Sequence, residues 1–250
     1  MNYDEGQGPR YGADIILPLY RAEDGDRAVF LEPRLNYANS EFLLNTGVGY
    51  RQLVKNRAWL VGGNMFWDYE TEAAHYRVGW GAEAVSRFAE LRANYYLGLS
   101  QKRLTEDTGG TQVFEEVVDG YDVEVGSPIP YYSRVKVFGG FNWYNYKEFK
   151  NRYGWTIRTE YTPVKYLVVD WLLSNDTKTN LDWGVTVAFR LPLGGNRAEP
   201  IRNPVRPDTT MFPESDMQGD LWRLVERHHE IVVEAERRTS GVSVEIVRND

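Results

Sequence analysis

Histidine and cysteine are the side chains best suited to acid–base, nucleophilic or metal chemistry at neutral pH. The chain has three histidines, His75, His228 and His229, and no cysteine. His75 has no serine in a recognisable setting, and a lone histidine is more often structural or solvated than catalytic. His228 and His229 are adjacent, so on a strand they would point to opposite faces and make a poor metal pair. We find no catalytic, metal or cofactor site and expect a protein that is not an enzyme.

Charged side chains instead recur at alternate positions between Asn45 and Leu191. In the run 88–100, Leu91 and Ala93 point one way, and Glu90 and Arg92 point the other. A period of two over about ten residues is typical of a strand with one apolar and one polar face. The polar faces mix acids and bases in nearly equal number, which favours a wet, ion-paired lumen over an ion-selective filter.

We expect this inward set to line the lumen, either as structural ion pairs or as a brace for a polypeptide threaded through the pore. The expected lumen or linker contacts are Arg34, Arg51, Asp68, Arg77, Glu83, Glu90, Arg92, Glu124, Arg134, Arg158, Glu160, Asp170 and Arg190. Inward glycines such as Gly47, Gly79 and Gly98 have two readings: barrel curvature with room for neighbouring side chains, or clearance for an inserted segment. Their spacing does not separate the two.

The apolar face carries most of the eight tryptophans of the chain. Trp222 lies beyond the repeating region, whereas seven lie on that face: Trp59, Trp67, Trp80, Trp143, Trp155, Trp171 and Trp183. Apolar outer faces with aromatic girdles and polar inner faces are typical of transmembrane β-barrels. We therefore predict an antiparallel up-and-down β-barrel whose seven outward tryptophans lie at the membrane interface. A soluble barrel would place its polar residues outside and its tryptophans within.

Bulk properties agree with this prediction. The 250 residues are 42% hydrophobic and 14% aromatic, and no run approaches the 18 apolar residues of a membrane helix. The net charge of −7 and the dispersed basic residues argue against nucleic-acid binding. Met1–Arg10 contains no apolar stretch typical of a secretion signal.

Turn residues divide the barrel region into eleven strand segments. We predict strands at 10–20, 28–37, 40–52, 57–69, 74–85, 88–100, 118–126, 132–145, 152–162, 166–174 and 180–191. One rim then carries turns near 22–27, 53–56 and 127–131, and the other carries the longest loop, Gln101–Val117, which we place outside the cell. Single-chain bacterial barrels have even strand numbers. We therefore expect twelve strands, the twelfth upstream of residue 10, and a native chain longer at its N-terminus, because residues 1–9 are too short and polar for a full crossing.

Four regions follow from these patterns: a remnant at 1–9, the barrel at 10–191, a pore-spanning linker at 192–220 and a C-terminal segment at 221–250. The linker is rich in proline, and about eight extended residues at ~3.1 Å each would span a barrel of roughly 25 Å. Residues 221–238 fit a short amphipathic helix or a hairpin with arms at 221–225 and 231–234. The strand-like run at 242–247 has no evident packing partner.

Several motifs resemble the β-domain of inverse autotransporters, the intimin and invasin adhesins. They are Ile16–Tyr20, Gly47–Arg51, Gly62–Asp68, Gly79–Glu83, Gly120–Glu124, Pro128–Tyr131, Glu160–Pro163 and, most specific, Leu224–Val232. The resemblance covers residues 10–238, although the family usually has an asparagine run where this chain has His228-His229-Glu230. It implies a twelve-stranded bacterial outer-membrane barrel whose linker passes outward and directs a C-terminal passenger to the cell surface. It also implies insertion by the outer-membrane barrel-assembly machinery.

The leading hypothesis is thus a type V translocator and anchor that exports and displays an adhesin-type passenger. Its expected partners are the outer-membrane lipid bilayer, the assembly machinery, and its own linker and passenger, with no nucleic acid and no cofactor. A passive porin-like channel with its tail in the periplasm is the alternative. A barrel enzyme centred on His75 is a third reading.

Overall fold

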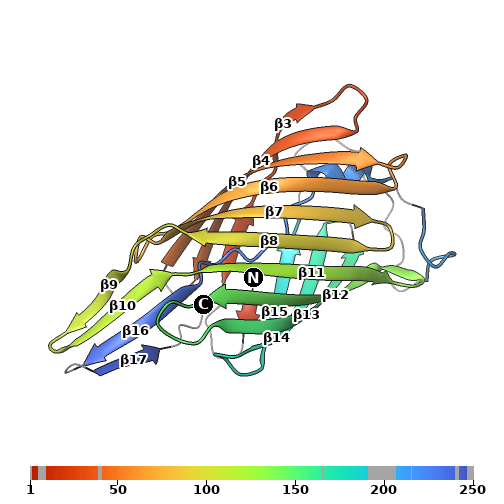
Figure 1. The fold of residues 1–250 in the computed structure, drawn as a ribbon. Helices are drawn as coiled ribbons and strands as arrows, with labels where there is room; N and C mark the ends of the chain where they lie inside the picture. The colour runs from red at the N-terminus through yellow and green to blue at the C-terminus, as the bar shows by residue number, and fades with distance from the viewer. Residues whose placement is uncertain are drawn as a thin grey trace.

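A computed structural model describes residues 2–4, 10–38, 41–164, 166–190, 207–214, 216–239 and 242–246, and it is almost entirely antiparallel β-structure. The main sheet contains 13 strands (Figure 1). They are β1 (Asn2–Asp4), β2 (Tyr11–Asp14), β3 (Leu17–Arg21), β4 (Arg27–Ala38), β5 (Glu41–Val54), β6 (Trp59–Glu70), β7 (Tyr76–Ser86), β8 (Glu90–Gly98), β11 (Asp119–Ile129), β12 (Tyr132–Asn145), β13 (Arg152–Val164), β14 (Leu167–Asp176) and β15 (Asp182–Phe189). Neighbours in the chain pair in an up-and-down order, which confirms the predicted fold class.

The predicted strand at 10–20 is broken into β2 and β3, which both pair with β4. Counted as one, they give the sheet twelve strand positions. The twelfth is occupied by β1, in which Tyr3 lies opposite Val185 of β15 in antiparallel register. The short N-terminal strand therefore lies within residues 1–9, a region that the sequence reading judged too short and polar for a full crossing. Among the described residues, β1 and β2 are the two ends of the strand order and are not paired with each other.

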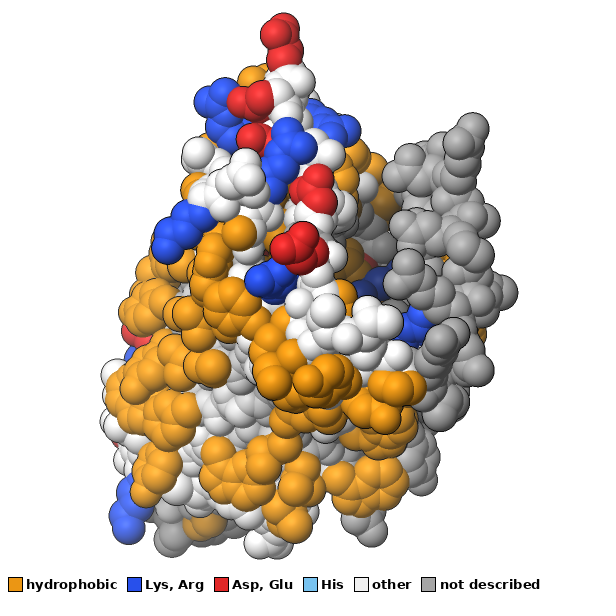
Figure 2. All heavy atoms as spheres, turned by 90° about the vertical axis from the view of Figure 1, so that its right-hand side faces the viewer, with side chains coloured by type: hydrophobic (Ala, Val, Ile, Leu, Met, Phe, Trp, Pro, Cys, Tyr) orange, Lys and Arg blue, Asp and Glu red, His pale blue; other side chains and the backbone are white. Residues whose placement is uncertain are grey.

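Alternate residues of each strand face opposite environments. In β5, Asn45 and Arg51 are fully buried, whereas Val48 and Tyr50 are exposed. Five of the seven outward tryptophans are exposed by 41–54%, namely Trp67, Trp80, Trp155, Trp171 and Trp183. Trp59 and Trp143 are only half-buried. Hydrophobic side chains cover much of the face drawn in Figure 2. The sheet is thus polar inside and apolar outside, the reverse of a soluble barrel. Among the described residues, no helix is both long and apolar enough to cross a membrane.

A second sheet of four strands extends beyond one end of the barrel (Figure 1). Its order is β17 (Val242–Ile246), β16 (Val233–Thr239), β10 (Thr111–Val117) and β9 (Arg103–Thr108). The predicted loop at 101–117 is therefore mostly a hairpin, which turns at Gly109 and Gly110 with φ of +55° and +118°. Such values favour glycine because it has no Cβ.

The C-terminal region differs from both forms expected for 221–238. It contains a short 3₁₀ helix, η1 (Met217–Trp222), then a non-repetitive stretch, then β16 and β17, which pair as a hairpin from Thr239↔Val242 to Ala235↔Ile246. The run near 242–247 does have a partner, because β16 offers it an edge. The amphipathic pattern was misleading because this segment has protein on every side rather than on one helical face.

Candidate functional site

The C-terminal segment 207–233 runs through the barrel from one rim to the other. Asp208 and Met211 bond to the backbone of Tyr131 at the β11–β12 turn. Farther along the chain, Val225 contacts Phe30 and Phe66, and Val232 packs at the opposite ends of the strands. Figure 1 shows this segment, in blue, between the front and rear strands. Residues 192–206, the first half of the predicted linker, lie outside the described residues.

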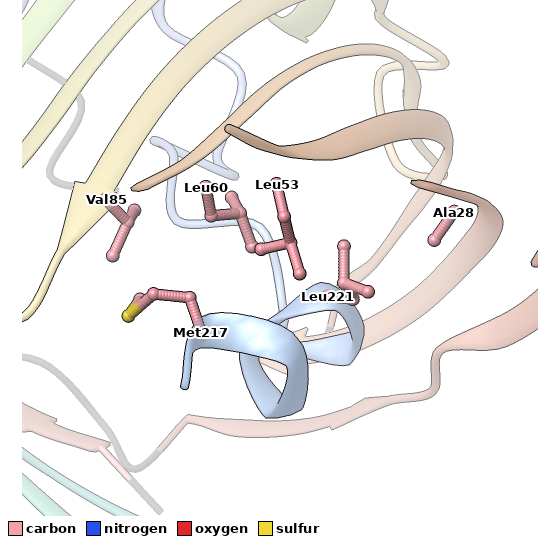
Figure 3. Packing of buried hydrophobic residues seen from close by; sticks show 6 residues of the cluster. All are labelled: Ala28, Leu53, Leu60, Val85, Met217 and Leu221. Carbon is pink, nitrogen blue, oxygen red and sulfur yellow. The ribbon is translucent and has the colours of Figure 1, made fainter. Parts of the chain in front are cut away.

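The segment enters the lumen through η1, whose apolar side fills one mouth of the barrel. Asp216 caps the helix by accepting a hydrogen bond from the backbone of Gln218 at 2.9 Å. Met217 and Leu221 are buried against the barrel wall (Figure 3). Their partners are Ala28, Leu53, Leu60 and Val85, from four neighbouring strands. Apolar burial in this cluster holds η1 against the barrel wall at this end.

Arg51 holds the segment just beyond η1. Its Nε donates to Glu83 Oε1 at 2.6 Å, and its Nη1 donates to the carbonyl oxygens of Leu221, at 3.1 Å, and Arg223. The guanidinium also lies 4.6 Å from the centre of the Phe30 ring. Arg51 is fully buried, so these acceptors take the place of its water shell. Arg223 in turn donates to Glu90 Oε2 at 3.1 Å.

Asp68 is the centre of the lumen network. Its carboxylate accepts two hydrogen bonds from Arg227 of the segment, at 2.8 and 2.6 Å, and one from Arg77 Nε at 2.7 Å. Asn45 donates to Asp68 at 2.7 Å and to the carbonyl of His229 at 3.1 Å. Arg77 donates to the carbonyl of His228 at 2.6 Å. Two-pronged arginine–carboxylate pairs of this kind combine charge with fixed geometry.

The charged side chains of the segment meet wall residues of opposite charge. Arg223 is in the extended region of backbone space, at φ −75° and ψ 151°. Arg223 and Arg227 bond to acids of β8 and β6. The charge of Glu226 interacts with basic residues of the wall, first with Arg158 of β13 and then with Arg92 of β8 and with Arg190. His228 contacts Tyr144 of β12 at 3.3 Å. Basic residues of the segment thus meet acidic wall positions, and its acidic residue meets basic ones.

The remaining predicted lumen residues pair mainly with one another. Arg92 bonds to Glu90 and Glu124, and Arg158 bonds to Glu124 and Asp170 at 2.9 and 3.0 Å. Further pairs are Arg34 with Asp14 at 2.6 Å, Glu160 with Arg190 at 3.8 Å, and Arg134 with the carbonyl of Pro163 at 2.7 Å. Four residues of the predicted lumen set form direct hydrogen bonds to the segment: Arg51, Asp68, Arg77 and Glu90. These positions lie along the strands that face it.

Sequence reasoning left Glu32, Asn45 and Tyr96 out of the contact set, yet each bonds to the segment. Glu32 accepts from the backbone of Val225 at 3.0 Å, and the Tyr96 hydroxyl accepts from the backbone of His228 at 2.9 Å. Asn45 and Tyr96 are uncharged, so a search for charges passed over them. Their inward parity was the available signal.

The lumen glycines mostly make room for barrel side chains. A Cβ on Gly47 would lie 2.4 Å from the Phe66 ring, and one on Gly49 would lie 2.2 Å from the Phe30 ring. Gly79 differs, because its Cβ would lie 2.9 Å from Nη2 of Arg227 in the segment. Gly47 and Gly49 thus make room for neighbouring barrel side chains, and Gly79 gives clearance for the inserted segment, so both expected roles occur.

His75 lies in a buried relay that the sequence did not reveal. Its Nδ1 is 3.1 Å from Ser100 Oγ, and its Nε2 is 3.3 Å from Glu115 Oε2. Ser100 Oγ also accepts from the backbone of Tyr76, and Ser100 is only 5% exposed, so a substrate could not reach the hydroxyl. The relay ties the start of β7 to β10. In the part of the chain that the structure describes, no three His, Cys, Asp or Glu side chains are grouped to hold a metal ion.

Comparison with known proteins agrees with the resemblance. The family model described as "Inverse autotransporter, beta-domain" matches residues 2–229. Invasin of Yersinia enterocolitica is 25% identical over 243 residues, which cover 91% of this chain and 27% of that protein. Inverse autotransporter adhesin YeeJ of Escherichia coli (strain K12) is 28% identical over 117 residues, which cover 47% of this chain and 5% of that protein. The chain therefore spans about a quarter or less of the length of these relatives.

Two solved structures show the fold. One, described as "Unveiling the Mechanism Behind the in-meso Crystallization of Membrane Proteins", has a TM-score of 0.77 at 21% identity and covers 94% of this chain and 97% of its own. The KdgM porin has a TM-score of 0.50 at 9% identity, covering 77% of this chain and all of its own. These two structures show the membrane-barrel fold alone. The family match points to a structural or transport protein of the bacterial outer membrane rather than to an enzyme. From the family match over nearly its whole length, this chain belongs to the inverse autotransporter family, as a β-domain.

Proposed function

We propose that this barrel is a translocator and anchor that carries a C-terminal passenger to the cell surface through its own lumen. The observation that supports this proposal best is the path of residues 217–233. They lie inside the barrel, and their contacts move steadily from the ends of the strands near Ala28 and Leu60 to the other ends near Val117. A polypeptide that occupies the lumen from mouth to mouth is the arrangement that export through the pore would leave behind.

The lumen charges would act as the brace in this function. Arg51, Asp68, Arg77 and Glu90 bond to the segment, and Glu83, Arg92, Arg158 and Glu160 hold those groups or their neighbours in place. The contacts to the segment include several to its backbone carbonyls. Such contacts are independent of side-chain identity and so would suit different residues passing the same point.

The direction of export follows from the rims. Longer connections of outer-membrane barrels lie on the extracellular side. The hairpin β9–β10 is the long connection here, and β16 lies beside it. The C-terminus would therefore be directed to the cell surface, and the outward tryptophans would anchor the barrel in the lipid bilayer after insertion by the assembly machinery.

Conductance of the chain in a planar lipid bilayer would test the proposal. We expect the full chain to be nearly closed and the chain without residues 192–250 to form a large, steady pore. A matched truncation that removes only 233–250 keeps η1 and the Asp68–Arg227 pair in the lumen and should stay closed. If all three conduct alike, the tail does not occupy the pore, and the porin-like alternative, which the porin fold also fits, would replace this function.

A further inference from the structure

The four-stranded sheet outside the barrel is made from two parts of the chain that lie far apart in sequence. Strands β9 and β10 form the connection between the barrel strands β8 and β11, whereas β16 and β17 follow the lumen segment. Strand β10 pairs with β16 along its full length, from Thr111↔Thr239 to Val117↔Val233. Without β16, the barrel hairpin would present a free strand edge, which is a ready template for pairing with another chain.

Besides β10, the turn after β12 also binds β16. The Glu234 carboxylate accepts hydrogen bonds from three successive backbone N–H groups, those of Lys147, Glu148 and Phe149, at 2.8, 2.9 and 2.7 Å. Glu234 itself is only 3% exposed. Successive N–H groups that converge on one point form an anion-binding nest. The turn thus recognises one carboxylate of the emerging strand.

Apolar contacts, a hydrogen bond and an ion pair complete the binding site for β16. Val117 of β10 packs against Ile231 and Val233 in a buried cluster, and the Tyr146 hydroxyl donates to the carbonyl of Val233 at 3.3 Å. Farther out, Lys102 pairs with Glu236 at 2.6 Å. Each of these groups contacts the end of the lumen segment or the residues that come directly after it.

We propose that β10 and the Lys147–Phe149 turn form a strand-capture site that binds residues 233–239 as they leave the lumen. This inference rests on the proposed export function and assigns the β9–β10 hairpin a role of its own. Capture would hold the emerged chain outside, because a strand in a sheet is too wide to re-enter a filled pore. The captured strand then offers its other edge to β17, so the exported chain continues to add strands in sequence.

A proline in β10 would test the capture edge. Val118 donates to the carbonyl of Val232 at 3.2 Å, and alternate residues of a strand bond to the same neighbour, so the Glu116 N–H also faces β16. Glu116→Pro removes that donor, and Glu116→Ala keeps it while removing the same side chain. Because the chain has no cysteine, Val244→Cys, at an exposed position of β17, gives a unique reporter. The measurement is its rate of labelling by a membrane-impermeant maleimide in cells that express the chain behind a secretion signal.

We expect Glu116→Pro to slow labelling about tenfold relative to Glu116→Ala, the factor that one lost backbone hydrogen bond can produce. The folded barrel, measured by its gel mobility without heating, should form equally in both. Glu234→Ala should slow labelling without any proline, whereas Arg237→Ala, at an exposed position, should not. Equal rates in all variants would overturn strand capture and leave export intact. If the reporter is never labelled, even without other substitutions, export itself is wrong and capture fails with it.

Discussion

At the scale of single residues, Asp68 has the most consequential position in the lumen. It is fully buried and neutralises two guanidinium groups, one from the barrel and one from the segment. Asp68→Asn would leave Arg77 and Arg227 buried without a counter-charge, and a broken buried pair costs about 3–5 kcal/mol. We expect the segment to leave the lumen more often, so that trypsin cuts after Arg227, which is protected in the parent chain.

Glu124→Gln is the matched control for that substitution. Glu124 pairs with Arg92 and Arg158 of the barrel, and among the described residues it does not bond to the segment. Its loss should leave the cleavage pattern near that of the parent chain. Equal cleavage of the two variants would show that Asp68 serves the barrel wall and does not retain the segment.

At the scale of elements, η1 is held by apolar packing in addition to the hydrogen bond from Arg51 to the carbonyl of Leu221. Leu221 is fully buried among Ala28, Leu53 and Leu60. Leu221→Ala should cost about 2–5 kcal/mol of the free energy that keeps η1 seated, because it leaves a cavity. The expected result is flickering conductance in a planar bilayer. Leu181→Ala, at a position that is 60% exposed, should leave the channel closed. A quiet Leu221→Ala channel would mean that the charged contacts alone close the pore.

The outer sheet should depend on pH through Glu236. Hydrogen bonds from Arg238 and Lys102 lower the pKa of Glu236 from 4.5 to about 2. A pKa that is lowered on folding gives stability above pH 4.5 that is lost as the pH falls towards 2. Amide exchange in β16 should therefore quicken across that range, faster than exchange in β5. Glu236→Gln should flatten this dependence, and an unchanged dependence would assign it to other carboxylates of the sheet.

Element boundaries in the barrel were predictable because lipid outside and charge inside repeat with a period of two. Strand β12 was predicted at 132–145 and is found at Tyr132–Asn145. The C-terminal segment was not predictable in the same way. Its shape depends on partners far away in sequence, such as Asp68 for Arg227, which are 159 positions apart. The buried Ser100–His75–Glu115 relay was missed for the same reason, since it joins a residue before β7, one after β8 and one in β10.

At the scale of the whole molecule, an apolar outer wall and a charged lumen would be unfavourable in water but suit a membrane. The outer wall exposes large apolar side chains on many strands, and the lumen buries many charges. An exposed apolar belt this extensive marks a membrane surface or an interface. The buried charges are tolerable because the segment and the wall neutralise one another. The apolar exterior and the ion-paired interior therefore fit a barrel that is surrounded by lipid and filled by polypeptide.

Tryptophan fluorescence separates these two surfaces in one experiment. Trp67 and Trp183 are exposed on the outer wall at 54% and 42%, whereas Trp222 packs inside against the η1 cluster. Single-tryptophan variants that keep Trp67, Trp183 or Trp222 should respond differently to brominated lipids, which quench fluorescence at short range. We expect strong quenching for the two outer residues, as for interface anchors, and little for Trp222. Because Trp222 is partly buried inside the lumen, a soluble quencher should reach it only after the segment is released, for example by Asp68→Asn. Strong lipid quenching of Trp222 in the parent chain would place η1 outside the lumen and contradict the path on which the export function depends.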